Sequence, residues 1–179
     1  MTEDISTLEE WRRLYDAAIR VKGIAPWEDR ITAVPPPERQ PIPLAMDVQA
    51  LEQLKQVPHS KARIEIDFFM LPAPTKEKGG SRLFFPYALM IVEAQSGLVL
   101  GTELLKPDPS LEAMWGQIPL HVVVKLARFG TVPAEIRVRS ELVLQLLRPV
   151  ATELGFRLKR SDRLRGLDQA KDFLLQRFT

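Results

Sequence analysis

Two acidic side chains stand inside the most strand-like segment of the chain. The stretch "KARIEIDFFMLP", residues 61–72, is dominated by branched and aromatic side chains, which is typical of a β-strand. Strand alternation places Glu65 and Asp67 on one face and Ile64 and Ile66 on the other. Carboxylate oxygens are the ligands that Mg²⁺ prefers, so Asp67 is either a working carboxylate or a charge on a solvated face of the strand.

Further carboxylates stand near the ends of predicted elements. Glu141 begins a predicted helix, and Asp168 and Asp172 are four residues apart on one face of the last predicted helix. Glu93 stands at a predicted hairpin and Glu112 in the first turn of another helix. Each also has a structural interpretation, since carboxylates are favoured in turns and in the first turn of helices.

The basic residues are concentrated toward the C-terminus. Residues 1–60 hold 7 Lys/Arg and 10 Asp/Glu, whereas residues 128–179 hold 11 and 6. The candidate binding residues are Arg139, Arg157, Lys159, Arg160, Arg163 and Arg165. Such a cluster can attract a polyanion, for example a nucleic acid. A solvated surface of mixed charge is the alternative, because acidic residues are interspersed and no aromatic stacking motif accompanies the arginines.

Several classes of site are excluded or disfavoured by composition. The chain has no cysteine, which excludes disulfides, thiolate metal sites and cysteine nucleophiles. His59 and His121 have no second ligand at metal-site spacing. The sequence shows neither the pattern of a signal peptide nor an apolar run of about 18 residues. We therefore expect a cytoplasmic protein without membrane contact or cofactor, with Mg²⁺ required only if the protein is a nuclease.

The first 60 residues are predicted to form an arm in front of the main domain. Apolar residues from 6 to 22 recur at helical spacing, with Thr7 as a capping residue and Gly23 as a stop. The proline-rich stretch "VPPPERQPIPL" at 34–44 favours an extended connector. A short helix capped by Asp47 follows at 47–56. We therefore divide the chain into an arm, 1–60, and a domain, 61–179.

The domain reads as an α/β (α+β) fold. Strands are predicted at 61–72, 82–94 and 97–107, then a helix at 110–130 broken near Pro119, a strand at 134–140, a helix at 141–154, a strand at 156–161 and a helix at 164–178. Pro149 should kink or divide the second helix. An antiparallel meander followed by parallel strands gives a mixed five-stranded sheet with helices on its faces.

This order resembles the ribonuclease H-like fold, particularly the catalytic cores of retroviral integrases and transposases, over about residues 61–178. The motifs that carry the resemblance are "IEID", "IVEAQSGLVLG" and "TVPAEIRVRS". The resemblance implies phosphodiester chemistry at two Mg²⁺ ions, with Asp67 as the first ligand. It implies a second ligand at the end of the fourth strand, where this chain has Arg139, and a third at Asp168 or Asp172.

A guanidinium cannot bind Mg²⁺, so the presence of Arg139 at the second ligand position changes the interpretation of Asp67 at the first. In a ribonuclease H-like sheet the first and fourth strands are parallel neighbours, which places Glu65 and Asp67 beside Arg137 and Arg139. We expect Asp67 to be held by a guanidinium where an active nuclease would hold a metal, because an unpaired buried carboxylate is costly. The hypothesis predicts Asp67 and Arg139 within salt-bridge distance.

Three functions remain open, and we lean against an enzyme. The first is a non-catalytic ribonuclease H-like module that binds protein or nucleic acid. The second is a structural or regulatory interaction protein that uses Trp11 and Trp27 of the arm. The third is a divalent-metal nuclease with a rearranged site on Asp67, Glu141 and Asp168. The chain also resembles an uncharacterised bacterial domain family, in which "LYDAAIRVKGIAPWE" is similar to an N-terminal signature, and this resemblance implies no function.

Overall fold

The chain falls into two compact units, Met1–Arg39 and Gln40–Thr179. A computed structural model describes residues 8–22, 41–76 and 83–177. The first unit contains helix α1 (Leu8–Lys22), which confirms the predicted first helix. Trp11 and Leu14 on this helix are exposed. Thr7, Gly23, Trp27 and most of the proline-rich connector lie outside the described residues.

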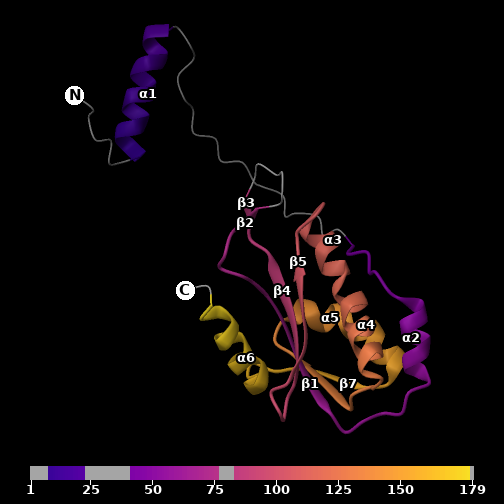
Figure 1. Cartoon of the computed structure of the whole chain (residues 1–179). Coiled ribbons are helices and arrows are strands. Elements are labelled where there is room, and N and C mark those ends of the chain that lie inside the picture. The colour runs from indigo at the N-terminus through magenta and orange to yellow at the C-terminus, as the bar shows by residue number, and fades with distance from the viewer. Residues whose placement is uncertain (1–7, 23–40, 77–82, 178–179) are drawn as a thin grey trace. The chain divides into compact units, whose positions relative to one another are not determined.

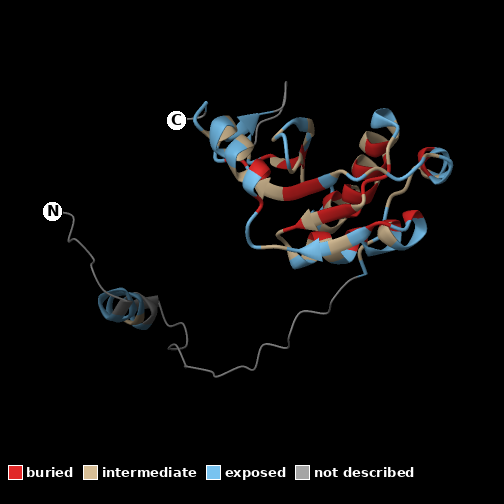
Figure 2. Cartoon of the chain, turned by 90° about the horizontal axis from the view of Figure 1, so that it is seen from below, coloured by how far each residue is buried: buried red, intermediate tan, exposed pale blue. Residues whose placement is uncertain are grey.

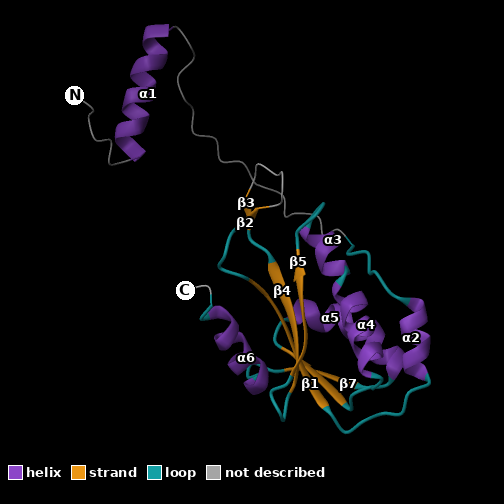
Figure 3. Ribbon diagram, viewed as in Figure 1, coloured by secondary structure: helices purple, strands orange, loops and turns teal. Residues whose placement is uncertain are grey.

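The second unit is built on a mixed five-stranded sheet, as predicted (Figure 3). Its strands are β1 (Arg63–Met70), β4 (Tyr87–Glu93), β5 (Val99–Leu105), β6 (Glu135–Val138) and β7 (Arg157–Arg160). Their order across the sheet is β5-β4-β1-β6-β7. The pairs β5/β4 and β4/β1 are antiparallel, and β1/β6 and β6/β7 are parallel. The first and fourth long strands are therefore parallel neighbours, and Glu65 is in register with Arg137.

Helices cover the two faces of the sheet unequally (Figure 1). One face carries α2 (Val48–Lys55), α3 (Leu111–Gly116), α4 (Ile118–Phe129) and α5 (Glu141–Leu154). The main core lies between these helices and the strands, where the buried side chains of Ile64, Ile66, Ile136 and Val138 point. Figure 2 shows this buried layer in red. The other face carries α6 (Arg165–Leu175), which packs on β1 and β4 over a smaller cluster.

The segment before β1 packs on the helices of the second unit. Asp47 caps α2 as predicted, because its Oδ1 accepts the Ala50 N–H at 2.9 Å. Helix α2 contacts α4 and α5. Upstream, the Ala45 N–H donates to the Gly116 carbonyl at 2.8 Å. Residues 41–60, which we grouped with the arm from the sequence, thus lie in the second unit.

One predicted strand and one predicted helix are divided. The strand expected at 82–94 is interrupted at Phe85 and Pro86, and its first part, β3 (Leu83–Phe84), pairs instead with β2 (Thr75–Lys76) as a separate ribbon. The helix expected at 110–130 breaks at Gln117, just before Pro119, into α3 and α4. This break confirms the prediction made from the proline.

Pro149 does not divide helix α5, so of the two predicted effects, a kink or a division, the division was wrong. The helix is continuous across its whole range. Proline removes the hydrogen bond to the carbonyl four residues earlier, that of Gln145. Both residues are exposed, so water can solvate that carbonyl, while Leu146, Leu147 and Val150 are buried on the opposite side. Packing of this apolar stripe keeps the helix intact.

The core face of α6 was predicted only in part. Leu167 is buried as expected, in a cluster with Leu164, Met90 and Val92. Helical spacing in the sequence predicts that Phe173 also faces the core, but its side chain is 62% exposed. The face of α6 that meets the sheet carries polar residues as well as Leu167, and these form the site described next.

Candidate functional site

Asp67 lies on β1 beneath α6 and is held by two cations. The residue is only 4% exposed. Its Oδ2 lies 4.0 Å from Nη1 of Arg139 and 3.5 Å from Nζ of Lys171. Its Oδ1 accepts the backbone N–H of Phe68 at 3.0 Å. The predicted ion pair with Arg139 is therefore present at the outer distance limit, and a second cation that we did not predict lies closer.

Arg139 joins Asp67 to helix α6. Its Nη2 hydrogen-bonds to Oδ1 of Asp168, which makes Arg139 a bridge between two carboxylates. These carboxylates, Asp168 first and then Asp67, raise the pKa of Arg139 above its usual value. Asp168 also accepts the Leu164 N–H through Oδ2, at 3.4 Å. We name Asp67, Arg139, Asp168 and Lys171 the Asp67 cluster.

Lys171 is fixed by an aromatic ring as well as by Asp67. Its Nζ lies 3.9 Å from the centroid of the Phe69 ring, a cation–π distance. The side chain is 23% exposed, so most of it is withdrawn from water. Phe69 and Asp67 share one face of β1, and both therefore meet the same turn of α6.

Glu65 attaches the start of α6 to the sheet. Its Oε2 accepts the Leu167 N–H at 3.0 Å, and the carboxylate is buried. The N-cap residue of α6, Leu164, supplies no side-chain cap of its own. A carboxylate at a helix N-terminus satisfies a free N–H and interacts favourably with the helix dipole. Glu65 therefore has a structural role that places Asp168 and Lys171 over β1.

A third buried carboxylate, Glu135, holds basic side chains of the strands that α6 leaves uncovered. Its side chain is 3% exposed and lies 2.7 Å from Nε of Arg137, 3.3 Å from Nζ of Lys159 and 3.6 Å from Nη2 of Arg157. The hydrogen bond from Arg137, followed by the one from Lys159, lowers the pKa of Glu135. Arg157 and Lys159 remain 69% and 57% exposed. We name Arg137, Arg157 and Lys159 the basic face.

The other predicted nuclease ligands are not gathered around Asp67. The Glu141 carboxylate lies 4.0 Å from Arg160, which also contacts Asp162 at 3.8 Å. Asp172 is exposed on α6. Among residues 8–22, 41–76 and 83–177, no group of three or more His, Asp or Glu side chains is placed to hold a metal ion.

Arg163 and Arg165, candidates for binding, are exposed at the start of α6.

The remaining sequence candidates have local structural roles. Glu93 accepts hydrogen bonds from both the N–H and the hydroxyl of Ser96, and these lower its pKa. Glu112 has a lowered pKa because its own N–H and the Ser110 hydroxyl bond to it. His121 has a lowered pKa because of burial. His59 is exposed in a bridge beside Val132.

Two residues of the site were missed by sequence reasoning, although each had a signal. Lys171 follows Asp168 by three residues, which places both on one face of the helix. Glu135 precedes Arg137 by two residues and so shares its face of β6. Neither signal identifies the side chain that each residue contacts. Those contacts depend on the rotation of α6 and the position of β7, which are set by tertiary packing.

Comparison with known proteins gives a family but no activity. Within the described part of the chain, no helix is long and apolar enough to cross a membrane. No curated protein matches the chain. Residues 50–175 match the family described as "Domain of unknown function (DUF6930)", which confirms the expectation of a family without assigned function. The stretch "LYDAAIRVKGIAPWE" precedes this matched region. The chain belongs to the DUF6930 family.

Proposed function

We propose that the second unit is a ribonuclease H-like domain without metal-dependent chemistry that binds a macromolecular partner. The observation that carries this proposal is the pairing of Asp67 with Arg139 and Lys171. Asp67 stands where the first metal ligand of an integrase-like enzyme is expected. In this chain it is neutralised by side chains instead.

The ribonuclease H-like assignment is supported by topology. The strand order β5-β4-β1-β6-β7 has the first long strand at its centre, with an antiparallel meander on one side and two parallel strands on the other. The middle of β1, the residue after β6 and the start of α6 meet at Asp67, Arg139 and Asp168. These are the three places at which the resemblance implies metal ligands.

The charges around Asp67 disfavour a divalent metal. Mg²⁺ binds where several oxygen ligands supply excess negative charge. Asp67 and Asp168 are the two carboxylates of the Asp67 cluster, and Arg139 and Lys171 balance them. A metal would have to displace both cations, and their like charge would repel it.

The partner surface is proposed to include the basic face. Helix α6 covers β1 and β4, so Arg157 and Lys159 remain exposed on β7. Glu135 holds these side chains in a fixed arrangement, which reduces the entropy lost when they bind a partner. Oppositely charged partners would be attracted to this surface.

A cleavage assay tests the absence of catalysis. Labelled single- and double-stranded DNA and RNA are incubated with the full chain in Mg²⁺ or Mn²⁺. We expect no cleavage above that of the Asp67→Ala variant prepared in the same way. Metal-dependent cleavage that Asp67→Ala abolishes would instead establish the nuclease with a rearranged site. A salt titration with the same nucleic acids measures phosphate contacts, which weaken steeply as salt rises.

Helix α1 supports a second candidate, a structural or regulatory protein that acts through its arm. Trp11 and Leu14 are large apolar side chains on one face of α1, and they are 60% and 45% exposed. Exposed apolar stripes of this kind often mark interaction sites. Self-association is the version of this role that can be measured on the pure protein. Sedimentation velocity should then show concentration-dependent association that Trp11→Glu removes, and a monomer at all concentrations would exclude it.

A further inference from the structure

We propose that the free edge of β7 receives an extended segment of a partner protein, in which apolar and acidic side chains alternate, as a sixth strand of the sheet. This inference rests on the proposed binding function and names its partner. Three features of β7 support three properties of that partner. The open backbone edge supports an extended strand, the groove beside the edge supports apolar side chains, and the positive charges on the opposite face of β7 support acidic side chains.

The backbone of β7 is available for pairing on its outer side. The N–H groups of Arg157 and Ser161 donate to Ala134 and Val138, on the β6 side, at 3.1 and 2.9 Å. Successive residues of a strand direct their N–H and C=O groups to opposite sides. The N–H and C=O of Leu158 and Arg160 therefore point away from β6, and β7 is the last strand of the described sheet. An exposed edge of this kind is a template for strand addition.

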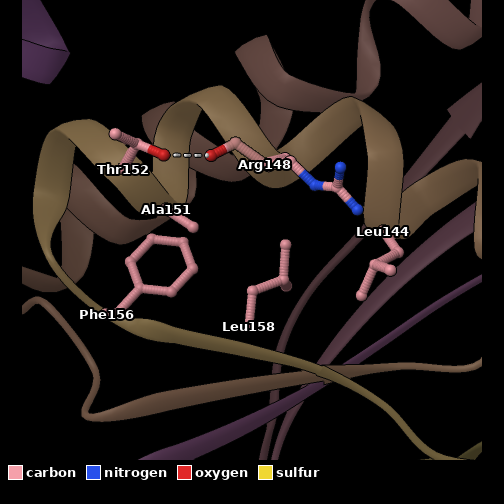
Figure 4. A pocket seen from close by; sticks show the side chains of 6 residues that line it. All are labelled: Leu144, Arg148, Ala151, Thr152, Phe156 and Leu158. Carbon is pink, nitrogen blue, oxygen red and sulfur yellow. Dashed lines mark hydrogen bonds between the residues drawn. The ribbon is translucent and has the colours of Figure 1, made fainter.

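An open groove runs along this edge beneath α5 (Figure 4). Its volume is about 220 Å³, and its lining residues are Leu144, Arg148, Ala151, Thr152, Phe156 and Leu158. Four of these six side chains are apolar, and the Arg148 side chain reaches along α5 above them. A strand added to β7 would direct every second side chain between α5 and the sheet, into this groove. Those side chains should be apolar.

The opposite face of the same strand is cationic. Arg157 and Lys159 point away from the α5 side, toward the Glu135 carboxylate, and both are more than half exposed. The remaining side chains of an added strand would lie beside them. Opposite charges at neighbouring positions of a sheet are favourable, so these side chains should be acidic.

The sheet already contains one pair of strands with this complementarity. Strand β6 alternates Ile136 and Val138 toward the core with Arg137 toward the α6 side. Its parallel neighbour β1 alternates Ile64 and Ile66 with Glu65, which is in register with Arg137. Strand β7 repeats the pattern of β6 at the outer edge, with Leu158 toward α5 and Lys159 opposite. A segment with the pattern of β1 is therefore the occupant that matches β7.

These features fit a protein strand better than a nucleic acid. The basic face is centred on the buried carboxylate of Glu135, which offsets part of its positive charge and would repel a phosphate. Arg160 is shared with Glu141 and Asp162. The groove offers apolar side chains rather than the exposed aromatic rings on which bases stack.

The test uses a fluorescein-labelled peptide, Gly-Ser-Ile-Glu-Ile-Asp-Ile-Glu-Gly, and the full chain. A second peptide with the same composition in blocks, Gly-Ser-Ile-Ile-Ile-Glu-Asp-Glu-Gly, is the control for charge and hydrophobicity. We expect the alternating peptide to bind at least about 10-fold more tightly, because only its pattern suits both faces of an added strand. Hydrogen exchange should slow at the outward N–H groups of Leu158 and Arg160 in the complex.

Two variants separate the groove from the charges. Ala151→Trp fills the groove, with Glu153→Trp as its control, since Glu153 faces Lys55 of α2. Lys159→Gln removes a charge from the basic face, with Arg128→Gln on α4 as its control. Each test variant should weaken binding of the alternating peptide by about 5-fold or more, and each control should leave the binding unchanged. For Lys159→Gln, this factor follows from the typical strength of one charge-assisted contact.

Each possible result bears on the proposal. Equal binding of the two peptides, or protection of residues elsewhere than β7, would overturn strand addition. A third result would be that neither peptide binds, whereas single-stranded DNA binds and Lys159→Gln weakens that binding. The partner would then be a nucleic acid and not a protein, and the proposed function of a non-catalytic binding module would still hold. Metal-dependent cleavage would instead contradict the proposed function, whatever the peptide result.

Discussion

The Nζ atom of Lys171 lies 3.5 Å from Oδ2 of Asp67, although 104 residues separate them in the chain. The contact exists because Glu65 accepts the Leu167 N–H and holds the first turn of α6 on β1. One carboxylate of β1 thus positions the helix whose lysine neutralises the next carboxylate on the same face. Arg139 completes the arrangement from β6.

Lys171→Met should destabilise the domain by about 1–2 kcal/mol, because Asp67 stays buried with only one cation nearby. Methionine retains the contact with Phe69. Asp67→Asn should lower the free energy of unfolding by less in the Lys171→Met variant than in the native chain. Urea unfolding of the four proteins of this double-mutant cycle should give a coupling of about 1 kcal/mol. Strict additivity would show that the two side chains do not interact.

Glu65→Gln should loosen α6 without unfolding the sheet. The amide can still accept the Leu167 N–H but loses the charge that interacts with the helix dipole, a loss of about 1 kcal/mol. Glu65→Leu leaves that N–H buried without an acceptor and should cost about 2 kcal/mol. Hydrogen exchange of the α6 amides should accelerate in this order. Equal acceleration in β1 and β6 would show global destabilisation instead.

Glu135 should make stability depend on pH in the acid range. Its pKa is lowered in the folded protein below the usual value of about 4.5, so the stabilisation is fully present above about pH 4.5. It is lost as pH falls through the lower folded pKa, because protonation removes the charge that pairs with Arg137 and Lys159. Glu135→Gln should flatten this part of the stability profile measured by urea unfolding. An unchanged profile would assign the acid sensitivity to other carboxylates.

Two glycine substitutions test the packing of the segment before β1. A Cβ at Gly116 would stand 2.1 Å from the Pro43 carbonyl oxygen, whereas at Gly166 the nearest atoms are 3.4 Å away. Gly116→Ala should therefore cost about 2 kcal/mol or more, through forced displacement of residues 41–46. Gly166→Ala should be neutral or slightly stabilising, since alanine favours helix by about 1 kcal/mol. Thermal unfolding compares the two, and tolerance of Gly116→Ala would show that this segment packs loosely.

The sequence was informative where local pattern determines the answer. Alternation in "IEID" and "EIRVRS" assigned Asp67 and Arg139 to one face, and the order of elements made their strands parallel neighbours. Both conclusions needed only the strand period and the connection rule for parallel strands. The ion pair of Asp67 with Arg139 followed from them.

Other features depended on contacts between distant elements. Lys171 could not be assigned to Asp67, because the rotation of α6 is fixed by Glu65 rather than by its apolar stripe. The same rotation leaves Phe173 exposed. Glu135 stands near the start of the strand predicted at 134–140, and its contacts with side chains of the neighbouring β7 cannot be read from that pattern. The predicted division of α5 at Pro149 was wrong because the prediction rested on local propensity and left out the packing of the buried residues on both sides of the proline.

The central claim is that cations, and not a metal ion, occupy the surroundings of Asp67. Paramagnetic broadening of backbone amide signals by Mn²⁺ tests it directly. We predict no selective broadening at Phe68 or Asp168 in the native chain, and selective broadening there in Arg139→Asp/Lys171→Gln, which converts the cluster to three carboxylates. Selective broadening of Phe68 and Asp168 in the native chain would contradict the claim.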